Sequence, residues 1–443
     1  MLRELLPLLV AGLVPFAVLV LIVLGTAVNL VAWQPPILQT TLFGTAASQN
    51  GITAIASDPT GVYAAGFVGY SNVAPTYLFV NKYGLDGQQI WTQHFGNPNF
   101  SSIVSIAAGQ GGVYAAGYLA ISPLSGSQFL RKYDSNGNLL WDLNVSGPGA
   151  VAASTNYIYL VGGYNNTRSY IAKFDSSGNL VWTRLFGAVG DRMSVVGESS
   201  GIYVANANSS RSGYVYAYAS NSTFLWTQTC SCEPMGITSD GIGVYVVGIV
   251  QTTSLAVPDG FLTKYDLNGN QLWTTKVAPP AGTEALVGAG ELRASADSSG
   301  VYLTETTGDV RGTVMKYDSN GNHVWSLVLP WTTGISLLTP SDVIVVTAQQ
   351  ASLYVGGDTR TISNGVNDTA FIASISESSS LVFFGINPPY SFGLVGLLVA
   401  AAAISIVWLR RQQKRRRVRP SLATSNYRLK KIPTDSFPSF IWE

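Results

Sequence analysis

Two long apolar runs bracket a middle section in which hydrophobic and polar residues alternate in short segments. Leu5–Leu24 and Tyr390–Leu409 are each twenty residues long and contain no charged side chain. Twenty helical residues span about 30 Å, the thickness of the hydrocarbon core of a bilayer. The middle segments are rich in Val, Ile and Tyr and are separated by Gly, Asn and Asp, which is typical of β-strands joined by turns. We therefore expect an all-β region between two transmembrane helices.

The charged residues beside the apolar runs predict an orientation. Arg3 and Glu4 precede the first run, and this nearly neutral start favours a retained signal-anchor helix; a signal peptide cut near Ala32 is the open alternative. A basic cluster follows the second run at Arg410, Arg411, Lys414, Arg415, Arg416, Arg417 and Arg419. Basic flanks stay in the cytoplasm, so we expect a protein of the cell membrane with its middle section outside. The predicted parts are 1–33 (signal anchor or signal peptide), 34–389 (extracellular), 390–409 (transmembrane helix) and 410–443 (basic cytoplasmic tail).

A ten-residue motif recurs seven times in the middle section. Its clearest copy is Lys132–Trp141, which reads KYDSNGNLLW. The last positions of the seven copies lie 41 to 58 residues apart, a period typical of propellers and solenoids. These blade-defining positions are Trp91, Trp141, Trp182, Trp226, Trp273, Trp325 and Phe383.

A second element, Gly-Val-Tyr-Ala-Ala-Gly or a relative of it, precedes each motif. Its seven tyrosines are Tyr63, Tyr114, Tyr159, Tyr203, Tyr245, Tyr302 and Tyr354. Each unit then reads as four strands, and Asn-Gly predicts a tight hairpin between the last two. The fold prediction is an all-β, seven-bladed β-propeller of four-stranded blades, flanked by N- and C-terminal transmembrane helices. We expect each motif's aromatic residue to pack between neighbouring blades, and its Lys to be solvated.

The closure of the ring is predicted from a further match. Residues 40–44 resemble the end of a fourth strand, although Leu381–Gly385 already supplies one for the seventh unit. We therefore expect residues 37–44 to add to the outer edge of blade seven, which protects the sheet edges of the ring.

The motif K-[YF]-D-x-x-G-N-x-x-W resembles the SBBP-type propeller repeat of bacterial and archaeal surface proteins, and it is also similar to PQQ-like propeller repeats. The resemblance covers residues 40–386 and implies a propeller that is secreted or anchored at the cell surface. It implies no single activity.

Composition narrows the function. The chain has 443 residues, of which 11% are charged, and its net charge is +1. This average combines a middle section with 14 basic and 21 acidic residues and a basic C-terminal tail. The even balance argues against nucleic-acid binding. Two Cys and two His leave few residues for metal binding or His-based catalysis, and no catalytic motif is present. We expect no catalytic residues, no metal ligands and no cofactor.

Three features carry candidate chemistry. The turn Asp134–Asn138 superficially resembles a calcium loop, but its spacing favours a turn. Cys230 and Cys232 are two buried thiols, a local disulfide or half of an intermolecular metal site. Candidate N-glycosylation sequons lie at Asn99, Asn144, Asn165, Asn208, Asn221 and Asn367.

These features favour a membrane-anchored, cell-surface propeller that acts as a binding, interaction or structural scaffold module. Its expected partners are the membrane and a protein or glycan at the propeller face, and no nucleic acid. One alternative is a propeller enzyme, quinone-dependent or hydrolytic, with its site in the axial channel. Another is an accessory subunit or receptor of a membrane complex.

Overall fold

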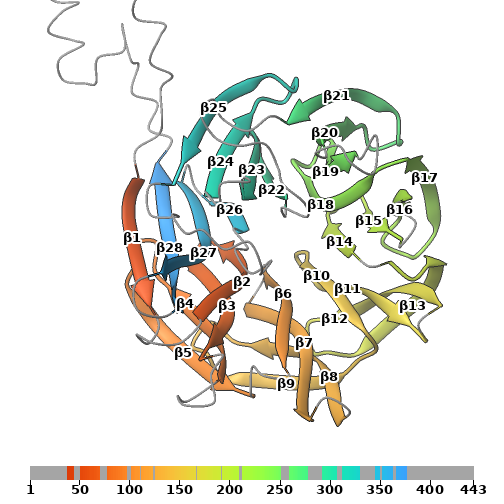
Figure 1. Ribbon diagram of the computed structural model, residues 1–443. Coiled ribbons are helices and arrows are strands. Elements are labelled where there is room, and N and C mark those ends of the chain that lie inside the picture. The colour runs from red at the N-terminus through yellow and green to blue at the C-terminus, as the bar shows by residue number, and fades with distance from the viewer. Residues whose placement is uncertain are drawn as a thin grey trace, which may run out of the picture. The chain divides into compact units, whose positions relative to one another are not determined.

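The computed structural model shows a ring of β-sheets (Figure 1). All described residues lie within Ala32–Ser378, which is one of two units of the chain. The described residues are 37–43, 50–69, 77–96, 101–109, 111–122, 125–165, 167–190, 192–208, 212–250, 259–277, 292–306, 312–329, 345–349, 352–362 and 366–376.

Six blades are built from four consecutive antiparallel strands each. Blade 1 contains β2 (Asn50–Asp58), β3 (Gly61–Val68), β4 (Tyr77–Tyr83) and β5 (Gln89–Phe95). Blade 2 contains β6 (Ser102–Gly109), β7 (Gly112–Ser122), β8 (Ser125–Tyr133) and β9 (Leu139–Asn144). Blade 3 contains β10 (Pro148–Ala153), β11 (Tyr157–Tyr164), β12 (Arg168–Asp175) and β13 (Leu180–Ala188). Blade 4 contains β14 (Arg192–Gly197), β15 (Ile202–Ala207), β16 (Gly213–Tyr218) and β17 (Phe224–Cys230). Blade 5 contains β18 (Glu233–Ser239), β19 (Val244–Val250), β20 (Asp259–Tyr265) and β21 (Gln271–Val277). Blade 6 contains β22 (Arg293–Asp297), β23 (Gly300–Thr306), β24 (Gly312–Tyr317) and β25 (His323–Val328).

The remaining sheet joins the two ends of the propeller sequence, and we call it the closing sheet. It contains β26 (Val345–Gln349), β27 (Ser352–Ile362), β28 (Val366–Ser376) and β1 (Ile37–Phe43), with β1 paired directly to β28. Its first strand, β26, contacts the first strands of blades 1 and 6, so the ring is continuous. An N-terminal strand thus covers the outer edge of the last sheet.

This arrangement contradicts the predicted seven-bladed propeller of four-stranded blades flanked by N- and C-terminal transmembrane helices. Six blades have four strands from one repeat, whereas the closing sheet takes its fourth strand from the N-terminus. We predicted that residues 37–44 would add outside a fourth strand near Leu381–Gly385. In the structure β1 pairs directly with β28, the third strand of the closing sheet. Residues 37–43 are therefore themselves the fourth strand of this sheet. Leu381–Gly385 lies outside the described residues.

Where the structure describes the chain, it shows no helix, and so none long and apolar enough to cross a membrane. The runs Leu5–Leu24 and Tyr390–Leu409, like the tail 410–443, lie outside the described residues. The predicted flanking helices are therefore no part of the fold that we describe.

The hairpin between the third and fourth strands explains why the motif contains Asp and Gly. In blade 2, Asp134 Oδ1 accepts hydrogen bonds from the backbone N–H groups of Asn136 and Asn138, and Asn138 Nδ2 donates to Asp134 Oδ2. Gly137 has a φ of +88°, and among these turn residues only it adopts positive φ. The loop is thus a three-residue turn closed by a left-handed glycine. The predicted tight hairpin between the third and fourth strands is confirmed.

The cores lie between adjacent sheets. Tyr245 and Val247 of β19, for example, pack with Leu303 of β23 in one buried cluster that joins blades 5 and 6. The first strands lie nearest the centre of the ring and the fourth strands form its outside (Figure 1). Each blade therefore buries both faces, and its outermost strand meets the solvent.

Candidate functional site

A row of three side chains crosses each blade at the repeated motif. In blade 2, Tyr114 on β7 is paired with Lys132 on β8, which is paired with Trp141 on β9. The Lys132 ammonium lies 5.3 Å from the centre of the Tyr114 ring, within the range of a cation–π contact. Blades 1, 3, 5 and 6 repeat the row, and blade 4 has Ala217 in place of the Lys.

The row continues into the following blade through one backbone carbonyl. Lys132 Nζ and Trp141 Nε1 both donate to the carbonyl of Ser176 in the hairpin of blade 3, at 2.9 Å and 3.3 Å. We call this arrangement the inter-blade latch. Both donors recur from blades 1, 3 and 5 onto Ser135, Ser220 and Ser319, and from blade 4 the Trp226 indole alone donates to Leu267. The prediction that the motif's tryptophans pack between blades is confirmed for these five.

The other two blade-defining residues, Trp325 and Phe383, are not among these five latch tryptophans. Trp325 of blade 6 is buried among side chains of the closing sheet, such as Leu353 and Phe371. Phe383 lies outside the described residues.

The prediction that the repeated Lys is solvated is wrong. Lys82, Lys132, Lys173, Lys264 and Lys316 are 4–8% exposed. Burial lowers the pKa of Lys132 and of Lys173, and each ammonium lies over a tyrosine ring and donates to a backbone carbonyl of the next blade. The sequence pattern missed this because a Lys on a third strand is ordinarily a surface residue.

A turn glycine lies directly beneath four of the five latch tryptophans. A Cβ atom on Gly269, whose φ is +87°, would lie 2.6 Å from the Trp226 ring. Gly137, Gly178 and Gly321 stand in the same relation to Trp91, Trp141 and Trp273. In blade 4 this position is Ser222, which keeps a positive φ of 72°. Close approach of the indole thus selects glycine at most turns.

Cys230 and Cys232 lie at the end of β17 and just after it. Their Cα atoms are 5.1 Å apart, and the two sulfurs are joined as a disulfide. This separation lies within the usual range for disulfides. Cys232 is buried against blade 5 residues such as Ile237. The redox state of the pair in solution stays a prediction.

The candidate glycosylation sites are dispersed over the ring. Asn144, Asn165 and Asn221 are exposed, and Asn208 is half-buried. Asn221 Oδ1 accepts a hydrogen bond from the backbone of Thr223. Asn367 lies in β28, and Asn99 lies outside the described residues. Modification of these sites stays a prediction.

The described first strands, which surround the ring axis, carry few ionisable groups. Arg192 of β14 and Glu233 of β18 form an ion pair of 2.9 Å. Asp58 and Asp297 each accept a hydrogen bond from a tyrosine of the next strand. No group of three His, Cys, Asp or Glu residues is placed to hold a metal ion within the described part of the chain. These contacts supply no observation in favour of the axial-channel enzyme.

Two buried polar side chains occupy a position that is glycine in other blades. Three residues after the second-strand tyrosine, blade 1 has Gly66, where a Cβ would lie 1.9 Å from the carbonyl oxygen of Gly51. This crowding accompanies a bulge in the first strand. The first strands of blades 4 and 6 pair without a bulge, and the position holds Asn206 and Glu305.

Both side chains leave buried oxygens without a hydrogen-bond partner. Asn206 Nδ2 donates to the carbonyl of Ala188 at 3.2 Å, but its Oδ1 has no partner. Glu305 is fully buried, and neither carboxyl oxygen has a partner. Burial raises the pKa of Glu305 to about 7. Sequence reasoning missed both residues, although alignment of the repeats shows Asn206 and Glu305 where the element Tyr-Ala-Ala-Gly has its last glycine.

The outermost strands of blades 2, 3 and 4 expose large apolar side chains. The first two residues of β9, β13 and β17 are apolar and 45–58% exposed in all three blades. We call this set the apolar rim: Leu139, Leu140, Leu180, Val181, Phe224 and Leu225. In blades 1, 5 and 6 the first of these two positions is instead Gln89, Gln271 or His323. The three strands lie on the outside of the ring in consecutive blades (Figure 1).

The comparisons with known proteins agree with a propeller. A family model of PQQ-type repeats, described as outer membrane protein assembly factor BamB, matches residues 167–365. The chain is thus a β-propeller with a repeat similar to the PQQ type, and nothing here confirms the finer likeness to the SBBP-type repeat. No curated protein matches the chain.

Several solved structures are similar in fold. The β-propeller domain of the trilobed protease from Pyrococcus furiosus is 10% identical, with a TM-score of 0.47 over 74% of this chain and 94% of that chain. The WD40 propeller of Doa1 is 12% identical, with a TM-score of 0.46 over 78% and 97%. An acylaminoacyl peptidase from Pyrococcus horikoshii is 10% identical, with a TM-score of 0.48 over 74% and 52%. At these low identities we take no activity from them.

Proposed function

We propose that the chain is a non-catalytic scaffold that binds a partner protein through its apolar rim. The observation that carries this proposal is the recurrence of two half-exposed apolar residues at one position of three consecutive blades. Single exposed apolar residues are common on protein surfaces, whereas an ordered set of them is typical of interaction sites. Removing this surface from water would stabilise a complex.

The margins of the apolar rim indicate the charge of the partner. Each hairpin turn beside Leu139 and Leu180 carries an exposed carboxylate, Asp134 or Asp175. Hydrogen bonds from Asn138 and Asn179 hold the pKa of these carboxyls below its usual value, so both are charged at neutral pH. We therefore expect a partner surface with an apolar centre and basic residues around it. A location at the extracellular side of the cell membrane stays a prediction, because it rests on sequence outside the described residues.

Site-specific photocrosslinking in cells tests this proposal. A benzoylphenylalanine at Leu140 should yield a discrete crosslinked protein, whereas the same probe at Ile242 should not. Ile242 is the matched control, because it is 73% exposed but stands alone in the turn between β18 and β19. The combined substitutions Leu140→Lys, Val181→Lys and Leu225→Lys should abolish recovery of that protein without lowering Tm.

Two results would contradict binding at the apolar rim. Equal crosslinking from Leu140 and Ile242, or undiminished recovery with the triple variant, would place the partner elsewhere. The described residues favour neither the enzyme nor the receptor alternative by a specific contact, and we propose neither.

A further inference from the structure

The interface between blades 4 and 5 is fastened differently from the other latched interfaces. Blade 4 has Ala217 at the position of the latch Lys, so only the Trp226 indole donates, to the carbonyl of Leu267 at 2.9 Å. The disulfide of Cys230 and Cys232 lies at the other end of the same outer strand, β17. A covalent bond is thus present at a latched interface from which the ammonium is missing.

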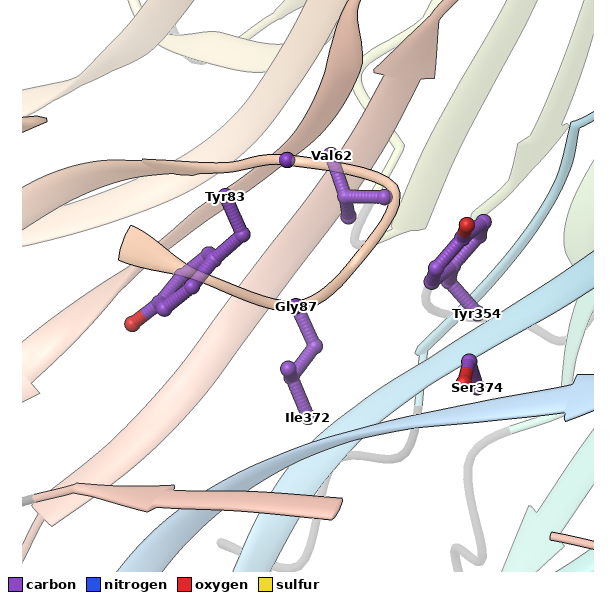
Figure 2. A pocket seen from close by; sticks show the side chains of 7 residues that line it. Val62, Tyr83, Gly87, Tyr354, Ile372 and Ser374 are labelled. Carbon is purple, nitrogen blue, oxygen red and sulfur yellow. The ribbon is translucent and has the colours of Figure 1, made fainter. Parts of the chain in front are cut away.

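The closing sheet also lacks the latch Lys, and it is fastened in another way. Ser374 on β28 is paired with Tyr354 on β27 at that register position. Both residues line a small cleft, and Tyr83 of blade 1 lies across it from Tyr354 (Figure 2). Here the direct pairing of β1 with β28 joins the two ends of the propeller. Each sheet without a latch Lys therefore has a substitute, and in blade 4 that substitute is chemically reversible.

The disulfide joins the outer strand of blade 4 to the inner strand of blade 5 over a very short crossover. Only Ser231 and Cys232 lie between β17 and β18. Cys230 is paired with Gly213, the first residue of β16. A Cβ atom on Gly213 would lie 2.7 Å from Cys230 Sγ and 2.8 Å from the Cys232 carbonyl oxygen. The bond thus packs directly against the backbone of blade 4 and holds the start of β18 beside it.

The two sulfurs differ in their surroundings. Cys232 is 6% exposed and packs with Ile237 of blade 5, whereas Cys230 is partly exposed and Ser231 is exposed. An incoming thiol therefore reaches Cys230 before Cys232. After reduction, the buried Cys232 would remain a neutral thiol and pack as a small apolar side chain. The oxidised and reduced pairs are both compatible with the folded blade.

The small size of the loop makes the bond easy to open in the folded protein. The two cysteines have a sequence separation of 2. Closing so short a loop removes little entropy from the unfolded chain, so the bond stabilises the fold by a factor of only about ten. By a thermodynamic cycle, folding protects the bond from reduction by the same factor. A mild reductant can therefore open it without unfolding the propeller.

We infer that Cys230 and Cys232 are a redox-active pair, which exchanges electrons reversibly with an external dithiol and fastens blade 4 to blade 5 in its oxidised form. A thiolate of the dithiol attacks Cys230 Sγ, the bond between the two cysteines breaks, and Cys232 leaves and takes up a proton. The second thiol of the reductant loses its proton, closes a disulfide with the first, and releases Cys230, which takes up that proton. Two electrons pass to the protein, and the reverse reaction restores the bond. This chemistry needs no partner at the apolar rim, so its failure would leave the proposed function untouched.

Glutathione redox buffers test the exchange on the full-length chain. Alkylation and mass spectrometry give the fraction of the pair that is oxidised at each ratio of thiol to disulfide, and far-UV circular dichroism reports the fold. We expect one reversible two-electron transition, with the fold retained and with an equilibrium constant within about tenfold of that measured in urea. The inference is overturned if the bond opens only in urea, or if opening it unfolds the propeller.

Single substitutions test which sulfur is attacked. In Cys232→Ala, the remaining Cys230 should react with oxidised glutathione at least about tenfold faster than the remaining Cys232 of Cys230→Ala, because only Cys230 is partly exposed. Equal rates would overturn the assignment of Cys230 as the sulfur that is attacked.

Hydrogen exchange tests the fastening of the two blades. Reduction should speed the exchange of backbone amides in residues 224–239 on the order of threefold or more, because strand ends that are no longer held together open more often. The matched segment 139–153 spans the crossover from blade 2 to blade 3, which is also short but has no cysteine, and it should not change. A variant with Cys230→Ser and Cys232→Ser should exchange as the reduced protein does, with or without reductant. Equal exchange in the two redox forms would overturn the fastening role.

Discussion

Lys132 Nζ on one blade donates a 2.9 Å hydrogen bond to the backbone carbonyl of Ser176 on the next. The contact is buried and charge-assisted, and the same carbonyl also accepts the Trp141 indole N–H. A hydrogen bond with one charged partner is stronger than a hydrogen bond between two neutral groups. The repeated motif thus encodes the connection between successive blades as well as the hairpin within one blade.

Substitution of Lys132 should test the strength of one latch. Lys132→Ala removes a buried ammonium that contacts both Tyr114 and Ser176, and we expect a loss of about 1–3 kcal/mol in the free energy of unfolding. Urea denaturation measures it. Lys276→Ala is the control, because its ion pair with Asp259 is exposed and should contribute less than about 1 kcal/mol. Equal losses for the two variants would contradict a special role for the latch.

The turn glycines allow the contact with the indole to be separated from backbone strain. Gly269 and Gly241 have φ values of +87° and +83°, but only Gly269 touches a tryptophan. Gly241→Ala should cost about 1 kcal/mol from the left-handed backbone alone. Gly269→Ala should cost about 1–2 kcal/mol more, because its Cβ collides with Trp226. Thermal unfolding of the pair measures the difference, and indistinguishable Tm values would refute the proposed packing.

The repeat itself was readable from the sequence because its markers lie on fixed strands. The two elements around Tyr114 and Trp141 share one phase, and that phase gave the number of strands per blade and the packing of the tryptophans. The buried Lys was missed, since its acceptor lies on another blade 44 residues away. A periodic pattern within one unit contains no information about the partner in the next unit.

The closing sheet shows a second limit of sequence analysis. Residues 40–44 were recognised as strand-like, but their direct pairing with β28 depends on a contact between the two ends of the propeller. The sequence offered two candidate strands for the outer edge of this sheet, residues 37–44 and Leu381–Gly385. Which of them pairs with β28 depends on how the ring closes.

The disulfide of Cys230 and Cys232 should be detectable by chemistry. Peptide mapping without reductant should recover the two cysteines in one oxidised peptide, 2 Da lighter than after reduction. Because the closed loop is very short, we expect reduction to lower the free energy of unfolding by only about 1–2 kcal/mol. Cys230→Ser with Cys232→Ser serves as the control, since reductant should then have no effect. Full alkylation of both thiols in protein that was never reduced would contradict the assignment.

Glu305 should make the stability of the propeller fall as the pH rises towards neutrality. Burial raises its pKa in the folded protein to about 7, whereas a carboxyl in an unfolded chain titrates near about 4.3. The folded state therefore binds the proton more tightly. The resulting stabilisation is complete below about pH 4 and is lost as the pH rises through about 7. The whole effect is on the order of 3 kcal/mol.

Urea titrations of the wild-type chain and of Glu305→Gln between pH 4 and 8 measure this effect. The amide cannot ionise, so the difference in free energy of unfolding between the two proteins should change across this range by the amount expected for Glu305. Other titrating groups are common to both proteins and cancel in the difference. Glu233→Gln is the matched control, because Glu233 is paired with Arg192 and its loss should leave the Glu305 contribution intact. If the difference in free energy of unfolding between wild type and Glu305→Gln stays constant with pH, Glu305 does not titrate in this range. The carboxyl would then have a partner that the structure does not show.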